Sequence, residues 1–102
     1  MNSFPNKELD EEELDMLIDK LVTEAGKLEK KLRNLTEKEV LEIIHQTDSQ
    51  ILDTLVGGMK ASPQNQKGEF ILVSAEAELV ERGALSVNNT SLHFLEHYPK
   101  YK

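Results

Sequence analysis

The residues most able to do chemistry lie near the end of the chain, where two histidines and a glutamate are closely spaced. His93, Glu96 and His97 match the letters of the inverted zinc-protease motif H-x-x-E-H. On a helix, residues four apart lie on the same face, as two zinc ligands require, and the glutamate is then available as a base. Such a centre also needs a third protein ligand and a cleft. Nothing in the sequence marks an upstream carboxylate for that role.

We therefore expect a plain amphipathic terminal helix, with no metal ligand, no cofactor and no catalytic residue. A metal-dependent hydrolase using His93, Glu96 and His97 is the least favoured of three functional hypotheses. Other forms of catalysis lack their residues. The chain has no cysteine, which removes thiol chemistry and thiolate metal sites, and no serine lies in a glycine-flanked nucleophile elbow. The sequence thus predicts a protein that is not an enzyme.

An acidic cluster near the start of the chain is the second candidate for a functional role. It comprises Glu8, Asp10, Glu11, Glu12, Glu13, Asp15 and Asp19. The simplest interpretation is a helix start, where acidic side chains complement the helix dipole. A second is the polar rim of a protein–protein contact, formed by Glu11, Glu12 and Asp15, that steers association. A third is imitation of nucleic-acid phosphates, by which the protein would block the basic groove of a DNA- or RNA-binding protein.

The overall charge limits the class of partner. The net charge is −7, so direct contact with nucleic acid or with an anionic membrane surface is disfavoured by repulsion. The first seven residues contain no apolar segment typical of a signal peptide, and no apolar run approaches the ~20 residues of a membrane span. We expect a cytoplasmic protein without a membrane segment.

The strongest pattern in the chain is a repeat of apolar residues that predicts one long helix over residues 7–35, after a flexible tail over residues 1–6. The repeat alternates at spacings of four and three residues, as in the a/d seam of a coiled coil, and consists of Leu14, Ile18, Leu21, Ala25, Leu28, Leu32 and Leu35. The flanking Leu17 and Val22 widen this face, which favours packing against more than one helix.

The leucine seam has two interpretations. It can be ordinary core that packs on later helices of the same chain, or it can be an interface between copies of the chain. We favour a homo-oligomer, with a dimer as the first choice, because the helix exceeds its expected partners in length. The residues assigned to this partner face are Leu14, Ile18, Leu21, Leu28 and Leu32.

Later elements are predicted from caps and turns. Thr36 and Glu39 form a capping box, so a second helix is predicted over residues 37–56, with Thr47 or Ser49 able to cap a second piece if it bends. Gly57 and Gly58 are interpreted as its stop. A third helix is predicted over 69–82 with Gly83 as its stop, although residues 69–74 also have the composition of a strand. A short helix over 90–97 completes a single domain.

The sequence thus predicts an all-α fold: a small helical bundle with a long, coiled-coil-like N-terminal helix that completes its core by self-association. The leading functional hypothesis is a non-enzymatic protein–protein interaction module of the regulator, inhibitor or adaptor type. The alternative is the nucleic-acid mimic. The identity of the protein partner is not encoded in any motif.

Overall fold

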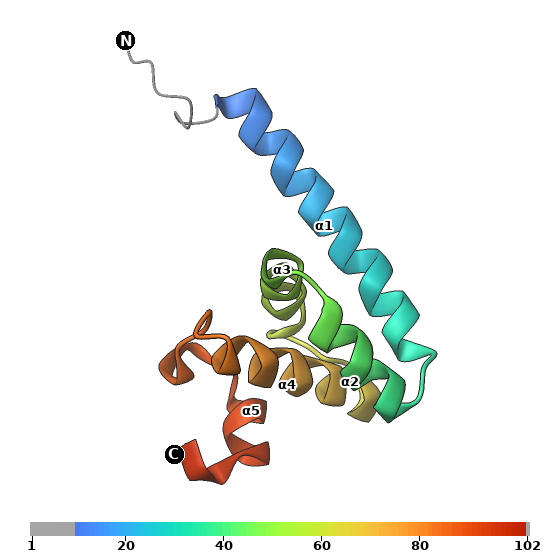
Figure 1. The fold of residues 1–102 in the computed structure, drawn as a ribbon, viewed down its shortest axis with the longest axis vertical. Coiled ribbons are helices and arrows are strands. Elements are labelled where there is room, and N and C mark those ends of the chain that lie inside the picture. Colours follow the sequence, from blue (N-terminus) through green and yellow to red (C-terminus); the bar gives the residue numbers. More distant parts are fainter. Residues whose placement is uncertain (1–9, 102) are drawn as a thin grey trace.

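The structure is a computed structural model that describes residues 10–101, and within them all regular structure is helical (Figure 1). The elements are α1 (Glu11–Arg33), α2 (Glu37–Gln46), α3 (Ser49–Met59), α4 (Gln66–Glu81), the 3-10 turn η1 (Val87–Asn89), α5 (Leu92–His97) and the 3-10 turn η2 (Pro99–Tyr101). The predicted all-α bundle with a long N-terminal helix is confirmed. The expected tail over 1–6 and the predicted helix start at residue 7 lie outside the described residues.

Helix α4 is the centre of the bundle. It contacts α1, α2, α3 and α5, and in Figure 1 α3 lies above it and α5 below it. The run 71–76 is buried without interruption, as expected for a helix that is covered on all sides. Residues 69–74 lie within this helix and do not form a strand. The core around α4 consists of Ala25, Leu32, Val40, Ile44, Leu52, Leu55, Val56, Met59, Ile71, Leu72, Ala75 and Leu79.

The predicted capping box at the start of α2 is confirmed. The Thr36 hydroxyl accepts a hydrogen bond from the Glu39 backbone N–H at 3.2 Å, and the Thr36 N–H donates to the Glu39 carboxylate at 3.0 Å. The hydrogen bond from the Thr36 backbone lowers the pKa of Glu39 below its ordinary value. A second capping box, which we did not predict, joins Asp10 and Glu13 at the start of α1.

The single helix predicted over 37–56 is wrong, because two helices, α2 and α3, occupy this range. Thr47 is extended, and Asp48, rather than Thr47 or Ser49, caps α3 by accepting a hydrogen bond from the Gln50 N–H at 2.8 Å. The guanidinium of Arg82 donates to the carbonyls of Thr47 and His45 at 2.8 and 3.0 Å. These carbonyls at the end of α2 are thus satisfied from a residue that is distant in sequence.

The glycine signals have opposite outcomes. Gly57 and Gly58 do not stop the helix, because α3 continues through them to Met59, which is buried in the core. Gly83 does end α4 as predicted, in the left-handed conformation with φ of 74°. Its N–H donates to the carbonyl of Val80 at 3.0 Å, and the Ala84 N–H donates to that of Leu79 at 2.8 Å. This pair of bonds is a Schellman motif.

Helix α5 is anchored on α4 through a buried carboxylate. It begins later than the predicted residue 90, with Ser91 as its N-cap. The Ser91 N–H and hydroxyl both donate to the fully buried Glu76, at 2.6 and 2.7 Å. Phe94 is also fully buried and lies 4.8 Å, centroid to centroid, from Tyr98. The two hydrogen bonds to Glu76 therefore fix the start of this six-residue helix on α4.

Within residues 10–101, no helix combines the length and the apolar character that a membrane span requires.

Candidate functional site

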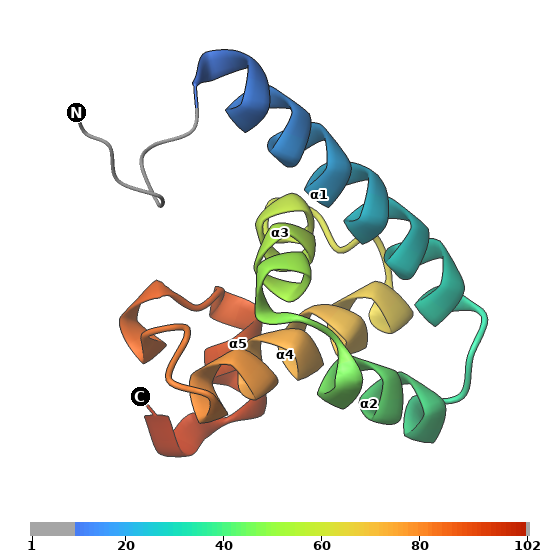
Figure 2. The ribbon, with the colours of Figure 1, turned by 45° about the horizontal axis from the view of Figure 1, so that its top comes forward.

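The apolar stripe of α1 is divided into a covered half and an uncovered half. In the second half of the helix, Ala25 and Leu32 are buried and Leu28 packs against the core. In the first half, Leu14 is 45% exposed and Ile18 is 47% exposed. Figures 1 and 2 show the first turns of α1 projecting beyond the other helices. The first half of α1 therefore carries a core-like pattern without a core.

The structure divides the partner face expected from the sequence. Leu14 and Ile18 are exposed and Leu21 is half-buried, so these three can reach a partner. Leu32 is fully buried and Leu28 packs on the core, so the fold assigns both to the chain's own interior. Beside the exposed part of the stripe, Leu17 and Val22 are 37% and 56% exposed. We define the α1 surface as Leu14, Leu17, Ile18, Leu21 and Val22.

A groove of about 310 Å³ continues from the α1 surface between α1 and α3. It is lined by Val22, Ala25, Gly26, Glu29, Thr54, Leu55 and Gly58. A Cβ atom built at Gly26 or at Gly58 would meet no heavy atom within 4 Å. Because these positions carry no side chain and face open space, another helix could approach the backbone closely there. Gly26 and Gly58 are far apart in the sequence and line one groove only because α3 packs on α1.

The charges on α1 are separated along its length. Glu11, Glu12 and Asp15, the expected acidic rim, are all exposed in the first turns. Lys27, Lys30 and Lys31 are exposed near the other end. Each set matches the helix dipole at its own end. The surface of α1 is therefore acidic in its first turns and basic near its end, and the apolar stripe passes through both regions.

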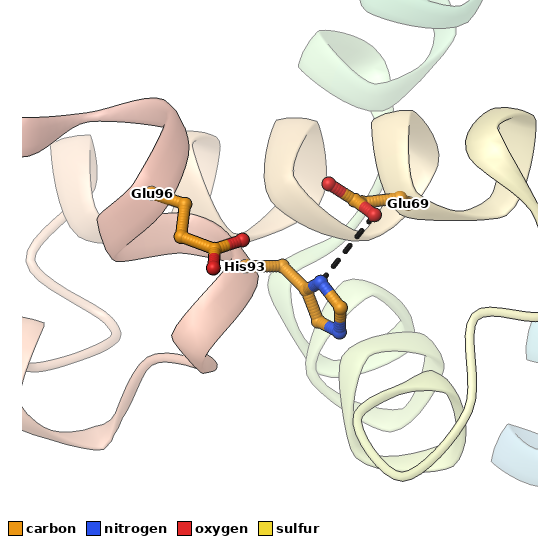
Figure 3. Close-up of side chains that lie close together, drawn as sticks. All are labelled: Glu69, His93 and Glu96. Atoms are coloured by element: carbon orange, nitrogen blue, oxygen red, sulfur yellow. Dashed lines mark ion pairs between the residues drawn. The ribbon is translucent and has the colours of Figure 1, made fainter.

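The terminal histidines meet a carboxylate that sequence reasoning did not find. Figure 3 shows His93 and Glu96 on α5 and Glu69 on α4, with an ion pair of 3.4 Å between Nδ1 of His93 and Oε1 of Glu69. The other Glu69 oxygen, Oε2, lies 2.8 Å from Nε2 of His97. The hydrogen bond from His97 lowers the pKa of Glu69 below its ordinary value, against the opposing effect of burial. We define Glu69, His93, Glu96 and His97 as the α4–α5 cluster.

Nothing in the local sequence marks Glu69 as a partner of this motif. It lies 24 residues before His93, and the two meet only because α5 folds back onto α4 through the Ser91–Glu76 contact. Neither the groove between α1 and α3 nor a second groove, formed by residues of α1, α2 and α3 around Leu28, Ile43 and Ile51, includes these residues. The cluster thus lies outside both, at a half-exposed position on the surface.

Comparisons of this chain with protein-family models, with curated proteins and with solved structures found no match. The features of the described residues that bear on function are therefore the α1 surface, the groove beside it and the α4–α5 cluster.

Proposed function

We propose that this protein is a non-enzymatic protein–protein interaction module that binds through the uncovered first half of α1. The observation that supports this most strongly is the exposure of Leu14 and Ile18 on a stripe whose continuation is buried. Fully burying one such side chain contributes about 1.5–3 kcal/mol. Leaving several of them half-exposed side by side forgoes that stabilisation, which a partner would restore.

We propose a second copy of the chain as the partner, with the two α1 helices antiparallel. An antiparallel pair places the acidic first turns of one helix beside Lys27, Lys30 and Lys31 of the other. A parallel pair would place the acidic turns together, where like charges repel. Charge complementarity therefore supports a second copy as the partner, in the antiparallel orientation.

The length of α1 fits this arrangement. Its 23 residues span about 34 Å at the usual helical rise. When two copies overlap over this whole length, they cross near Val22, and the stripe of each first half faces the second half of the other helix. There the glycine-lined groove between α1 and α3 is open to receive it. One contact of this kind would cover both α1 surfaces at once, as a two-fold dimer requires.

Sedimentation velocity over a concentration series tests the proposal. The unmutated chain should form a dimer that Ile18→Asp reduces to a folded monomer, because the new charge would have to be buried in the contact. Leu41→Asp is the matched control, since Leu41 is 50% exposed on α2, outside the α1 surface. It should leave the dimer intact. If the unmutated chain stays monomeric at high micromolar concentration, self-association is refuted.

Neutralising the acidic rim separates this proposal from the nucleic-acid mimic. The triple change Glu11→Gln, Glu12→Gln and Asp15→Asn should slow association and reduce its dependence on salt, because exposed charges act mainly on the association rate. In a mimic, the same acids would replace phosphates at the centre of the contact. Binding to a basic protein would then be nearly abolished, and duplex DNA would compete for it.

A further inference from the structure

The α4–α5 cluster combines three potential metal ligands from two helices. Glu69, His93 and Glu96 each offer one ligand atom, and these atoms all lie within 4.8 Å of one another. A tetrahedral ion with bonds of about 2.0–2.1 Å holds its ligand atoms roughly 3.4 Å apart. Small rotations of side chains that are half-exposed or exposed would bring the three atoms to that spacing.

The donor chemistry selects the class of ion. One imidazole nitrogen with two carboxylate oxygens is a mixed set that suits zinc and related divalent transition metals. Calcium and magnesium prefer sites made of oxygen ligands alone. The imidazole of His93 therefore favours a transition metal over these two ions.

Neighbouring side chains already hold the carboxylate of Glu69, the ligand that α4 supplies, in place. Oε1 of Glu69 faces Nδ1 of His93, while Nε2 of His97 lies 2.8 Å from Oε2. A hydrogen bond to the second oxygen of a ligating carboxylate fixes its orientation, which is the usual role of residues around a metal's ligands. On the opposite helix, the two bonds from Ser91 to buried Glu76 fix the start of α5, two residues before His93 and five before Glu96.

We propose that Glu69, His93 and Glu96 form a site for one divalent transition-metal ion of the zinc class, with His97 as a positioning residue. Three protein ligands leave the fourth coordination position to water. The ion joins α5 to α4 and adds a cross-link to a helix of six residues. Its proposed role is to stabilise the contact between these two helices.

The proposal departs from the expectation of a plain terminal helix because the missing ligand comes from another helix. The motif supplied His93 and Glu96, and the fold supplies Glu69. His97, which the motif would make a ligand, contacts Glu69 instead. The arrangement also does not depend on α1, so it stands or falls separately from the proposed dimer.

Isothermal titration of the full chain with zinc chloride at neutral pH tests the site. We expect one zinc ion per chain and a rise in the melting temperature with added zinc, because an ion that binds only the folded state stabilises it. Glu69→Gln and His93→Gln should each abolish this binding. His97→Ala should weaken it about 10- to 100-fold, the usual effect of removing a residue that orients a ligand.

His45→Gln is the matched control. His45 forms a similar pair with Glu78, at 3.2 Å, outside the cluster, so its replacement should leave zinc binding unchanged. Circular dichroism checks that each variant folds. If Glu69→Gln does not fold, the result for His93→Gln tests the site instead, because the His93 side chain is a third exposed. Zinc binding that survives His93→Gln, or no binding by the unmutated chain, would overturn the proposal.

Discussion

The two halves of α1 have the same apolar repeat and opposite surroundings. From Ala25 to Leu32 the repeat faces α3 and α4 and is buried or half-buried. From Leu14 to Ile18 the same repeat is exposed. The difference shows that periodicity determines which side of a helix seeks cover. The length of the helices that follow determines how much of that side is covered within the chain.

The lengths of the helices explain where the cover ends. Helix α1 has 23 residues and α3 has 11, or about 34 Å and 16 Å at the usual rise. A crossing helix of that size covers only part of a longer one. The loop before α4 also fixes which part is covered, because Arg33 at the end of α1 donates to the Pro63 carbonyl at 3.2 Å and to Asn65 at 3.1 Å.

The sharpest test of the comparison removes one side chain from each half. Leu32→Ala should lower the free energy of unfolding by about 2–5 kcal/mol, because it leaves a cavity at a fully buried position. Leu14→Ala should change it by no more than about 0.5 kcal/mol in dilute, monomeric protein. Urea denaturation at low concentration measures both. Equal losses would show that the first half is covered within the chain after all.

A smaller effect is expected at the junction that follows the covered half. Thr36→Ala should cost about 0.5–2 kcal/mol, the usual loss for an N-cap residue, because it removes the acceptor for the Glu39 N–H. The control is Thr23→Ala, at an exposed position inside α1, where alanine favours the helix slightly. Thermal unfolding should separate the two variants. A midpoint unaffected by Thr36→Ala would mean that the cap does not stabilise α2.

The smallest expected effect is on the pH dependence of folding stability, and it arises from carboxylates of α2 and α4, outside the first half of α1. The backbone of Thr36 lowers the pKa of Glu39, and the hydrogen bonds from His45 and Arg82 lower the pKa of Glu78 despite its partial burial. A carboxyl group with a lowered folded-state pKa contributes stability above its unfolded value, and this is lost as the pH falls below about 4.5. Glu39→Gln should therefore flatten the acid limb of the stability curve. Ile18→Asp should leave the contribution of Glu39 to that limb unchanged.

The sequence predicted the elements that depend on local signals. The a/d repeat of α1, the Thr36 capping box and the Gly83 stop each act within a few residues, and all three are confirmed. A break near Thr47 was only the alternative to one helix over 37–56, because the break depends partly on Arg82, which lies at the end of α4 and far away in the sequence. Gly57 and Gly58 were misinterpreted because burial of Met59 outweighs the local preference of glycine for helix ends.

In the candidate sites too, the residues that depend on local spacing could be predicted from the sequence, and those that depend on tertiary contacts could not. Leu14 and Ile18 could be named from periodicity, but only the packing of α3 shows that Leu32 is unavailable to a partner. His93 and Glu96 could be named from their spacing. Glu69 could not, since its place beside them results from a contact between helices far apart in the chain.

Concentration-dependent hydrogen exchange tests most directly whether the first half of α1 is completed by a second copy. In dilute protein, the amides over residues 11–20 should exchange faster than those over 25–33, because no tertiary contact protects them. Raising the concentration should slow exchange over 11–20, while 25–33 stays unchanged. Ile18→Asp should remove that concentration dependence. Equal exchange in both halves, or exchange over 11–20 that does not change with concentration, would contradict the account.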